Sequence, residues 1–74
     1  MQKIDDYARQ MTIIARNIKK LRIEKHFTVQ ELAYRCDMER SNLSRLEAGR
    51  TNPTLRTLHT VSHALEVPLD ALFR

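Results

Sequence analysis

Apolar residues recur at steps of three and four along nearly the whole chain, and few helix-breaking residues interrupt them. Only one glycine and two prolines occur among the 74 residues. No segment alternates apolar and polar residues as a half-buried strand does. Spacing by three and four brings side chains to one face of an α-helix. The sequence therefore predicts an all-α domain whose helices are joined by short connections.

The longest apolar stripe predicts a first helix from about Asp5 or Asp6 to Lys25. The acidic start suits the positive end of the helix dipole, and the basic end suits the negative one. We expect the early stripe to pack on the subunit's own core, with a seam between two copies as the alternative. The stripe comprises Ile4, Tyr7, Met11, Ile14, Ile18 and Leu21.

A capping box indicates the start of the second helix, which is predicted over about residues 29–36. Thr28 is a favourable N-cap and Glu31 stands three residues further on, while Phe27 and Leu32 occupy the positions of a hydrophobic staple. The face that this helix buries is expected to hold Leu32, Ala33 and Cys36.

Three further helices follow. The third is predicted from about Arg40 to Ala48, where Gly49 suits a left-handed terminating position. Thr54 caps a fourth that reaches about Leu65, and Pro68 begins a short last one. The fourth helix is expected to turn Leu55, Leu58, Val61 and Leu65 inward, and the last carries Leu69, Leu72 and Phe73.

The modest positive charge makes nucleic-acid binding plausible, although such a balance is common in ordinary proteins. Thirteen basic residues face nine acidic ones, giving a net charge of +4. Nine of the thirteen are arginine, whose planar fork matches phosphates and base edges. Four basic residues of the first helix are expected to be mostly a solvated face that supplies one or two phosphate contacts. These four are Arg16, Lys19, Lys20 and Lys25.

Several classes of protein are disfavoured. A single cysteine permits no disulfide within the chain, and no apolar run is long enough for a membrane span or a signal peptide. We therefore expect a cytoplasmic protein, or a nuclear one if the host has a nucleus. No nucleophile with a base, phosphate-cradling glycine loop or carboxylate pair is apparent, so we expect no enzyme and no cofactor.

Five spaced motifs resemble the phage-repressor-like (Xre/Cro type) helix-turn-helix DNA-binding family. They are "LR" in the first helix, "TxxELA", "SxLSRLExG", "NPTLxTL" and "ALxVPLDxL", in register from about Ile18 to Phe73. The resemblance implies a five-helix, lambda-repressor-like domain with an N-terminally extended first helix. Residues 11–74 would form this DNA-binding domain, and residues 1–10 an extension that continues its first helix.

The resemblance also implies a function and its residues. The family binds double-stranded DNA, usually as a homodimer on a palindromic operator, and RNA polymerase is a further partner where such a protein activates. The base-reading positions fall on Glu39, Arg40, Ser41 and Arg45. The phosphate-contacting positions fall on Thr28, Gln30, Ser44, Arg50, Thr51 and Asn52. A structural ion pair falls on Arg22 and Glu47.

Three positions depart from the family pattern. Val29 stands where a phosphate-binding glutamine is common, so Thr28, Gln30 or a backbone amide has to substitute. Asp37 and His26 stand where glycines are common. Aspartate tolerates the left-handed backbone region better than most residues, and histidine tolerates it at greater cost.

The third helix itself is suited to a DNA groove. At about 100° per residue, Leu43 and Leu46 mark one side, and Ser41, Ser44, Arg45 and Ala48 lie opposite. Small side chains let the helix approach the floor of a major groove about 12 Å wide, where arginine can fork onto guanine. Glu39 could accept from cytosine or orient Arg40, and we favour orientation.

Other interpretations are weaker. A protein-interaction module of the same fold, of antitoxin or anti-repressor type, is the alternative function. His59 and His63 have the i, i+4 spacing of zinc ligands but no third ligand near them in sequence, so we expect no metal site. Cys36 is expected to be a buried apolar residue. We expect neither membrane association nor a small-molecule ligand.

Overall fold

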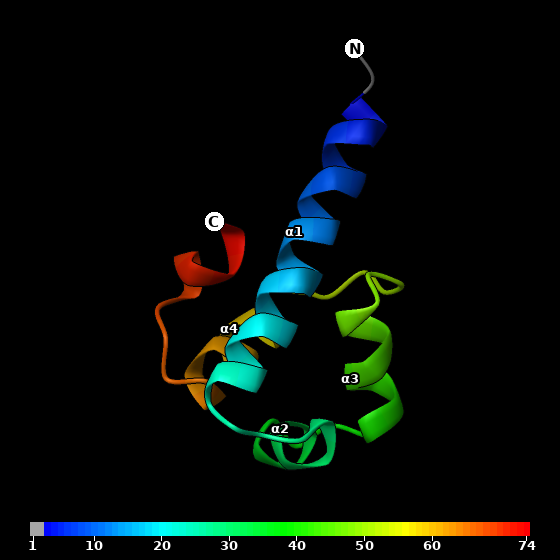
Figure 1. Cartoon of the computed structure of the whole chain (residues 1–74). Helices are drawn as coiled ribbons and strands as arrows, with labels where there is room; N and C mark the ends of the chain where they lie inside the picture. Colours follow the sequence, from blue (N-terminus) through cyan, green and yellow to red (C-terminus); the bar gives the residue numbers. More distant parts are fainter. Residues whose placement is uncertain (1–2) are drawn as a thin grey trace.

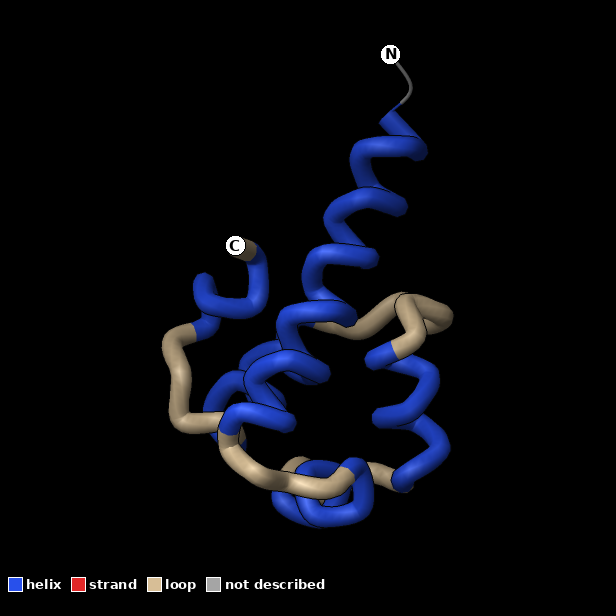
Figure 2. Tube along the Cα trace, viewed as in Figure 1, coloured by secondary structure: helices blue, strands red, loops and turns tan. Residues whose placement is uncertain are grey.

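The structure, a computed structural model, describes residues 3–74, with side chains from residue 6 onward. Ile4, the first member of the predicted stripe, therefore lies outside the described side chains. The chain forms four α-helices and one 3-10 helix: α1 (Lys3–Glu24), α2 (Val29–Arg35), α3 (Arg40–Glu47), α4 (Leu55–Ala64) and η1 (Leu69–Phe73). Short loops join these elements, and residues 3–74 contain no strand (Figure 2).

The all-α prediction is confirmed, but the predicted count of five α-helices is not. The last element is a 3-10 helix, in which the amide of Ala71 donates to the carbonyl of Pro68 at 3.0 Å. A segment of five residues offers few partners for i→i+4 bonds, and the tighter i→i+3 pattern suits such short pieces.

The core is small and draws on every element. Its fully buried large side chains are Ile18, Leu32, Leu43, Val61, Leu65 and Leu72. The long helix α1 contacts both α3 and η1, α2 packs against α3 and α4, and α4 also meets η1. The N-terminal turns of α1 extend beyond the other elements (Figure 1). Within the described chain, no helix has the length and apolar character that a membrane crossing requires.

The apolar stripe of α1 divides near its middle. Met11, Ile14 and Ile18 are buried, so this part packs on the subunit's own core, as predicted. Tyr7 is 54% exposed. The stripe predicts which side of the helix faces inward, but no other helix reaches far enough along α1 to cover this turn.

Leu55 corrects the sequence prediction in the same way. It was expected to point inward with Leu58 and Val61, but it is 66% exposed, whereas those two residues are buried. Leu55 occupies the first turn of α4, where Leu69 of η1 borders it on one side of an open surface depression. Leu55 lies on the inward side of α4 by its spacing, but the core does not extend to the first turn of this helix.

Side-chain caps begin α2 and α4 as the sequence predicted. The hydroxyl of Thr28 accepts from the amide of Glu31 at 3.0 Å, and the Glu31 carboxylate accepts from the amide of Thr28 at 2.7 Å. These reciprocal bonds form the expected capping box. Thr54 accepts from the amide of Thr57 at 3.1 Å.

All four α-helices end in the same left-handed turn. Gly49 has a φ of 73°, and the three non-glycine residues in equivalent places are His26 at 65°, Asp37 at 54° and Glu66 at 59°. Each turn has the paired 6→1 and 5→2 backbone bonds of a Schellman motif; after α3, for example, the amide of Arg50 donates to the carbonyl of Arg45. The sequence predicts the left-handed turn at three of these positions, but not at Glu66.

Candidate nucleic-acid interface

Helix α3 has one buried and one exposed side. Leu43 and Leu46 have exposed fractions of 0% and 2% and hold the helix against α1 and α2. Arg40, Ser41, Ser44, Arg45 and Ala48 are all exposed. The side of α3 that carries small residues and arginines is therefore exposed to solvent, as the helical periodicity predicted.

The predicted base-reading residues differ in their local contacts. The guanidinium of Arg45 donates to the side-chain oxygen of Asn42, one turn earlier on α3. Glu39 is the N-cap of α3, but its carboxylate makes no capping bond. The ion pairs of the described side chains are Arg22–Glu47 and Asp70–Arg74, so the structure contains no pairing of Glu39 with Arg40.

The start of α2 brings two of the predicted phosphate-contacting residues to the surface. Thr28 and Gln30 are exposed, whereas Val29 is half-buried against the core. The backbone amide of Thr28 is already bonded to Glu31, and the Thr28 oxygen accepts a bond. A hydroxyl that accepts still has its hydrogen to donate. The Thr28 hydroxyl and the Gln30 amide are therefore the side-chain donors left at this helix start.

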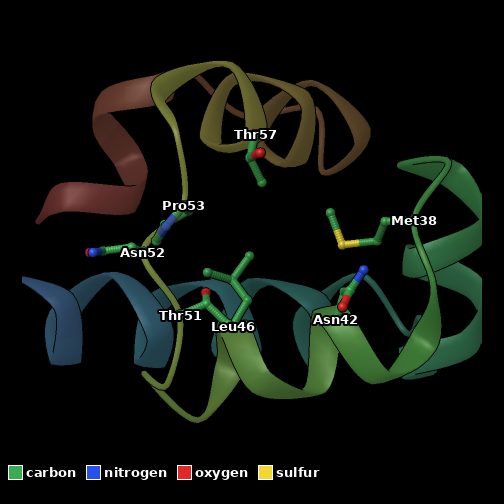
Figure 3. Close-up of a pocket in the computed structure, with 7 residues that line it drawn as sticks. All are labelled: Met38, Asn42, Leu46, Thr51, Asn52, Pro53 and Thr57. Atoms are coloured by element: carbon green, nitrogen blue, oxygen red, sulfur yellow. The ribbon is translucent and has the colours of Figure 1, made fainter.

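The loop between α3 and α4 carries the other predicted phosphate contacts. Arg50 and Asn52 are exposed, and Thr51 is half-buried. The loop borders a surface cavity of about 320 Å³ between α3 and the start of α4. Leu46 and Thr57 point into this cavity, whereas Asn52 points away from it (Figure 3).

Lys19 is a functional candidate that the sequence alone does not distinguish from the other lysines of α1. It lines a depression of about 240 Å³ together with Ser44 of α3, with Ala48 directly after that helix, and with Val29 at the start of α2. The neighbouring Lys20 lies instead beside η1. Only the packing of α1 on α3 distinguishes these adjacent lysines.

A buried ion pair connects α1 to the end of α3 behind this surface. Arg22 of α1 donates through Nε to Oε2 of Glu47 at 2.7 Å and through a terminal nitrogen to Oε1 at 3.1 Å. It also donates to the backbone carbonyl of Phe27 at 2.9 Å. The side chains of this pair, which the resemblance implied, are 11% and 8% exposed. The pair therefore ties the end of α3 to α1 and to the turn before α2.

The remaining candidates stay away from this surface. Cys36 is buried, as expected, and burial raises the pKa of its thiol. His59 and His63 are exposed on α4. Across the described residues, no three histidine, cysteine, aspartate or glutamate side chains gather as metal ligands.

Two short helices at a tight turn, with the second presenting an open polar face, define the helix-turn-helix class. A family model described as helix-turn-helix (HTH_3) matches residues 18–72 of this chain. The chain therefore belongs to the helix-turn-helix family, in its phage-repressor-like (Xre/Cro type) branch.

Curated relatives agree with this assignment. The immunity repressor protein of Bacillus phage phi105 is 36% identical over 59 residues, which cover 80% of this chain and 41% of the repressor. SinR of Bacillus subtilis, an HTH-type transcriptional regulator, is 36% identical over 61 residues, covering 81% of this chain and 55% of SinR. The chain thus spans about half the length of these two relatives.

Solved structures share the fold. A hypothetical transcription factor from Neisseria, NHTF, superposes with a TM-score of 0.85 at 28% identity, covering 88% of this chain and 75% of its own. The restriction-modification controller protein C.Esp1396I, crystallised as a tetramer with its natural 35-base-pair operator, has a TM-score of 0.79 at 31% identity. That match covers 86% of this chain and 84% of the controller chain.

Proposed function

We propose that this chain is a sequence-specific double-stranded DNA-binding transcriptional regulator that reads a palindromic operator as a homodimer. The observation that carries the proposal is the exposed face of α3, where Arg40 and Arg45 flank small side chains while Leu43 and Leu46 are buried. Family membership and the operator-bound controller protein support it. Residues 11–74 would form the binding domain, with residues 1–10 as an extension.

In this proposal α3 lies in the major groove. Arg40 at its start and Arg45 in its middle donate to guanine O6 and N7, and each bidentate pair contributes about 1–3 kcal/mol of discrimination. Ser41 reads a neighbouring base, and Glu39, unpaired with Arg40 in the structure, accepts from a cytosine amino group. Contact with guanine requires the Arg45 guanidinium to turn from Asn42 toward the groove.

Contacts to the DNA backbone flank α3 on both sides. Thr28 and Gln30 donate to a phosphate from the start of α2. Lys19 and Ser44 border a depression that Val29 of α2 also lines. The loop after α3 contributes Arg50, Thr51 and Asn52 at the other end. Contacts of this kind position the reading helix without carrying sequence information.

The proposed dimer face lies on the side formed by α4 and η1. Leu55 is 66% exposed, and together with Leu69, Arg56 and His59 it borders one shallow depression. Exposed apolar side chains that gather in one place are typical of an interaction site. A two-fold axis at this face should place the two copies of α3 about 34 Å apart, one turn of DNA.

Selection of bound sequences from a random duplex pool tests the function. The full chain should enrich a two-fold symmetric motif, and the Arg40→Ala, Arg45→Ala double variant should lose that enrichment. If the chain enriches no duplex, the DNA-binding proposal is wrong, and a protein-interaction module of this fold becomes the better description. We propose no reaction and no cofactor for the chain.

A further inference from the structure

We propose that Tyr7 is a positioning residue that orients the side-chain amide of Asn52 toward a DNA phosphate. The N-terminal turns of α1 would then form part of the DNA-binding surface, although they precede the region that the family model matches. This inference rests on the proposed function, in which the loop after α3 meets the DNA backbone. It adds a residue that neither the family motifs nor the charge pattern indicates.

The contact joins segments that are far apart in the sequence. The hydroxyl of Tyr7 donates to Oδ1 of Asn52, 45 positions further along the chain. The loop approaches α1 at a second place, since a Cβ atom built on Gly49 would lie 3.8 Å from the Cβ of Ala15. The loop between α3 and α4 therefore approaches α1 at two places.

Little else fixes Asn52. Arg50 is anchored by the bond from its amide to the carbonyl of Arg45 at 2.9 Å, and Thr54 is anchored as the cap of α4. Between them, neither Thr51 nor Asn52 donates a backbone hydrogen bond to another described residue, and proline has no amide hydrogen to donate. The hydrogen bond from the Tyr7 hydroxyl thus holds the centre of this loop.

The polarity of the bond matters for a phosphate ligand. Phosphate ester oxygens accept hydrogen bonds, so Asn52 can bind them only through the two N–H groups of its amide. An amide rotated by half a turn would present its carbonyl oxygen and repel the phosphate. In the structure the Tyr7 hydroxyl donates to Oδ1, so both N–H groups of the Asn52 amide remain for the DNA. Asn52 is exposed and points away from the cavity behind the loop (Figure 3).

Tyr7→Phe isolates this effect because it removes the hydroxyl and keeps the ring. Tyr34→Phe is the matched control, since Tyr34 is 84% exposed and its hydroxyl bonds no described residue. The probes are a duplex that the wild-type chain selects from a random pool and a scrambled version of it, with binding followed by fluorescence anisotropy. Thermal unfolding by circular dichroism shows whether each variant is folded.

We expect Tyr7→Phe to weaken binding about three- to tenfold, the effect of one hydrogen bond, and equally on both duplexes. Asn52→Ala should weaken binding as much, and Tyr7→Phe should add nothing in that background. Asn52→Asp keeps the acceptor for Tyr7 but turns a carboxylate toward the phosphate, so it should bind more weakly than Asn52→Ala. Tyr34→Phe should bind as the wild type does.

Two results would overturn the inference while leaving the proposed function intact. One is wild-type affinity in Tyr7→Phe. The other is an equal loss from Tyr7→Phe with and without Asn52, because this would mean that Tyr7 acts elsewhere. A wild-type chain that selects no duplex would overturn the proposed function and the inference together. That outcome is recognised before any variant is compared.

Discussion

Arg22 and Glu47 meet through two hydrogen bonds of 2.7 and 3.1 Å, with both side chains about nine-tenths buried. The same guanidinium holds the carbonyl of Phe27 at the entrance to α2. One side chain of α1 thus fixes both ends of the helix-turn-helix unit. The orientation of α3 relative to α2 depends on this contact.

Replacement of Glu47 by alanine should lower the free energy of unfolding by about 3 kcal/mol, because the guanidinium would stay buried without its partner. Asp70→Asn is the matched control. It breaks the Asp70–Arg74 pair, in which both side chains are 69% exposed, and exposed pairs contribute less than about 1 kcal/mol. Urea unfolding followed by circular dichroism measures both. Equal midpoints for the two variants would contradict a structural role for Arg22 and Glu47.

Arg40→Ala and Arg45→Ala should each weaken binding to the selected duplex by about 1–3 kcal/mol and relax base preference near the lost contact. The reason is that a guanidinium fork discriminates guanine from the other bases. Titration of each variant on the selected and scrambled duplexes separates base reading from general attraction. A loss of the same size on both duplexes would reject a reading role.

Arg50→Ala and Lys19→Ala should weaken binding to every duplex alike, because phosphates carry no sequence information. Each variant should also reduce the steepness of the plot of log affinity against log salt by about 0.9. The reason is that a protein with one phosphate contact fewer releases fewer counterions when it binds. Lys20→Ala removes the same charge on the side of α1 next to η1 and should keep the wild-type slope. A slope changed equally by Lys19→Ala and Lys20→Ala would mean that only net charge matters.

Local signals in the sequence predicted most of the fold. Thr28 and Thr54 begin α2 and α4 through their own side chains, and Gly49 occupies a backbone region that glycine enters without steric cost. Glu66 takes the same left-handed turn, but glutamate carries no preference that would announce it. Leu55 lies at the helical spacing of the buried residues of α4, yet it is exposed. The spacing of apolar residues does not show where the neighbouring element ends.

The candidate site divides in a similar way. The exposed side of α3 follows from helical periodicity once Leu43 and Leu46 are assigned inward. The contact between Tyr7 and Asn52 could not be predicted, because it joins two exposed polar groups 45 positions apart. The distinction between Lys19 and Lys20 likewise depends on how α1 packs against α3 and η1. Tertiary contacts of this kind leave no local pattern.

Glu31→Gln should reduce the loss of stability in acid. The hydrogen bond from the backbone amide of Thr28 holds the pKa of Glu31 below its ordinary value of 4.5. A carboxyl whose pKa is lower in the folded state stabilises the fold above the unfolded pKa, and loses this effect as the pH falls through the folded one. The melting temperature of the wild type should therefore exceed that of Glu31→Gln at pH 7 by more than it does well below pH 4.5. A pH-independent difference would contradict this assignment.

Leu55→Asp should dissociate the proposed homodimer without unfolding the subunit. Leu55 is the first residue of α4, where an aspartate interacts favourably with the helix dipole, and its side chain is 66% exposed. In a dimer that buries this face, the new carboxylate would instead be desolvated next to apolar side chains, which is costly. Ile23→Asp is the matched control, because Ile23 is an exposed apolar residue on α1, 54% accessible. Sedimentation velocity should show a monomer for Leu55→Asp and the wild-type dimer for Ile23→Asp. Dimers in both variants would mean that the two subunits pair through another surface.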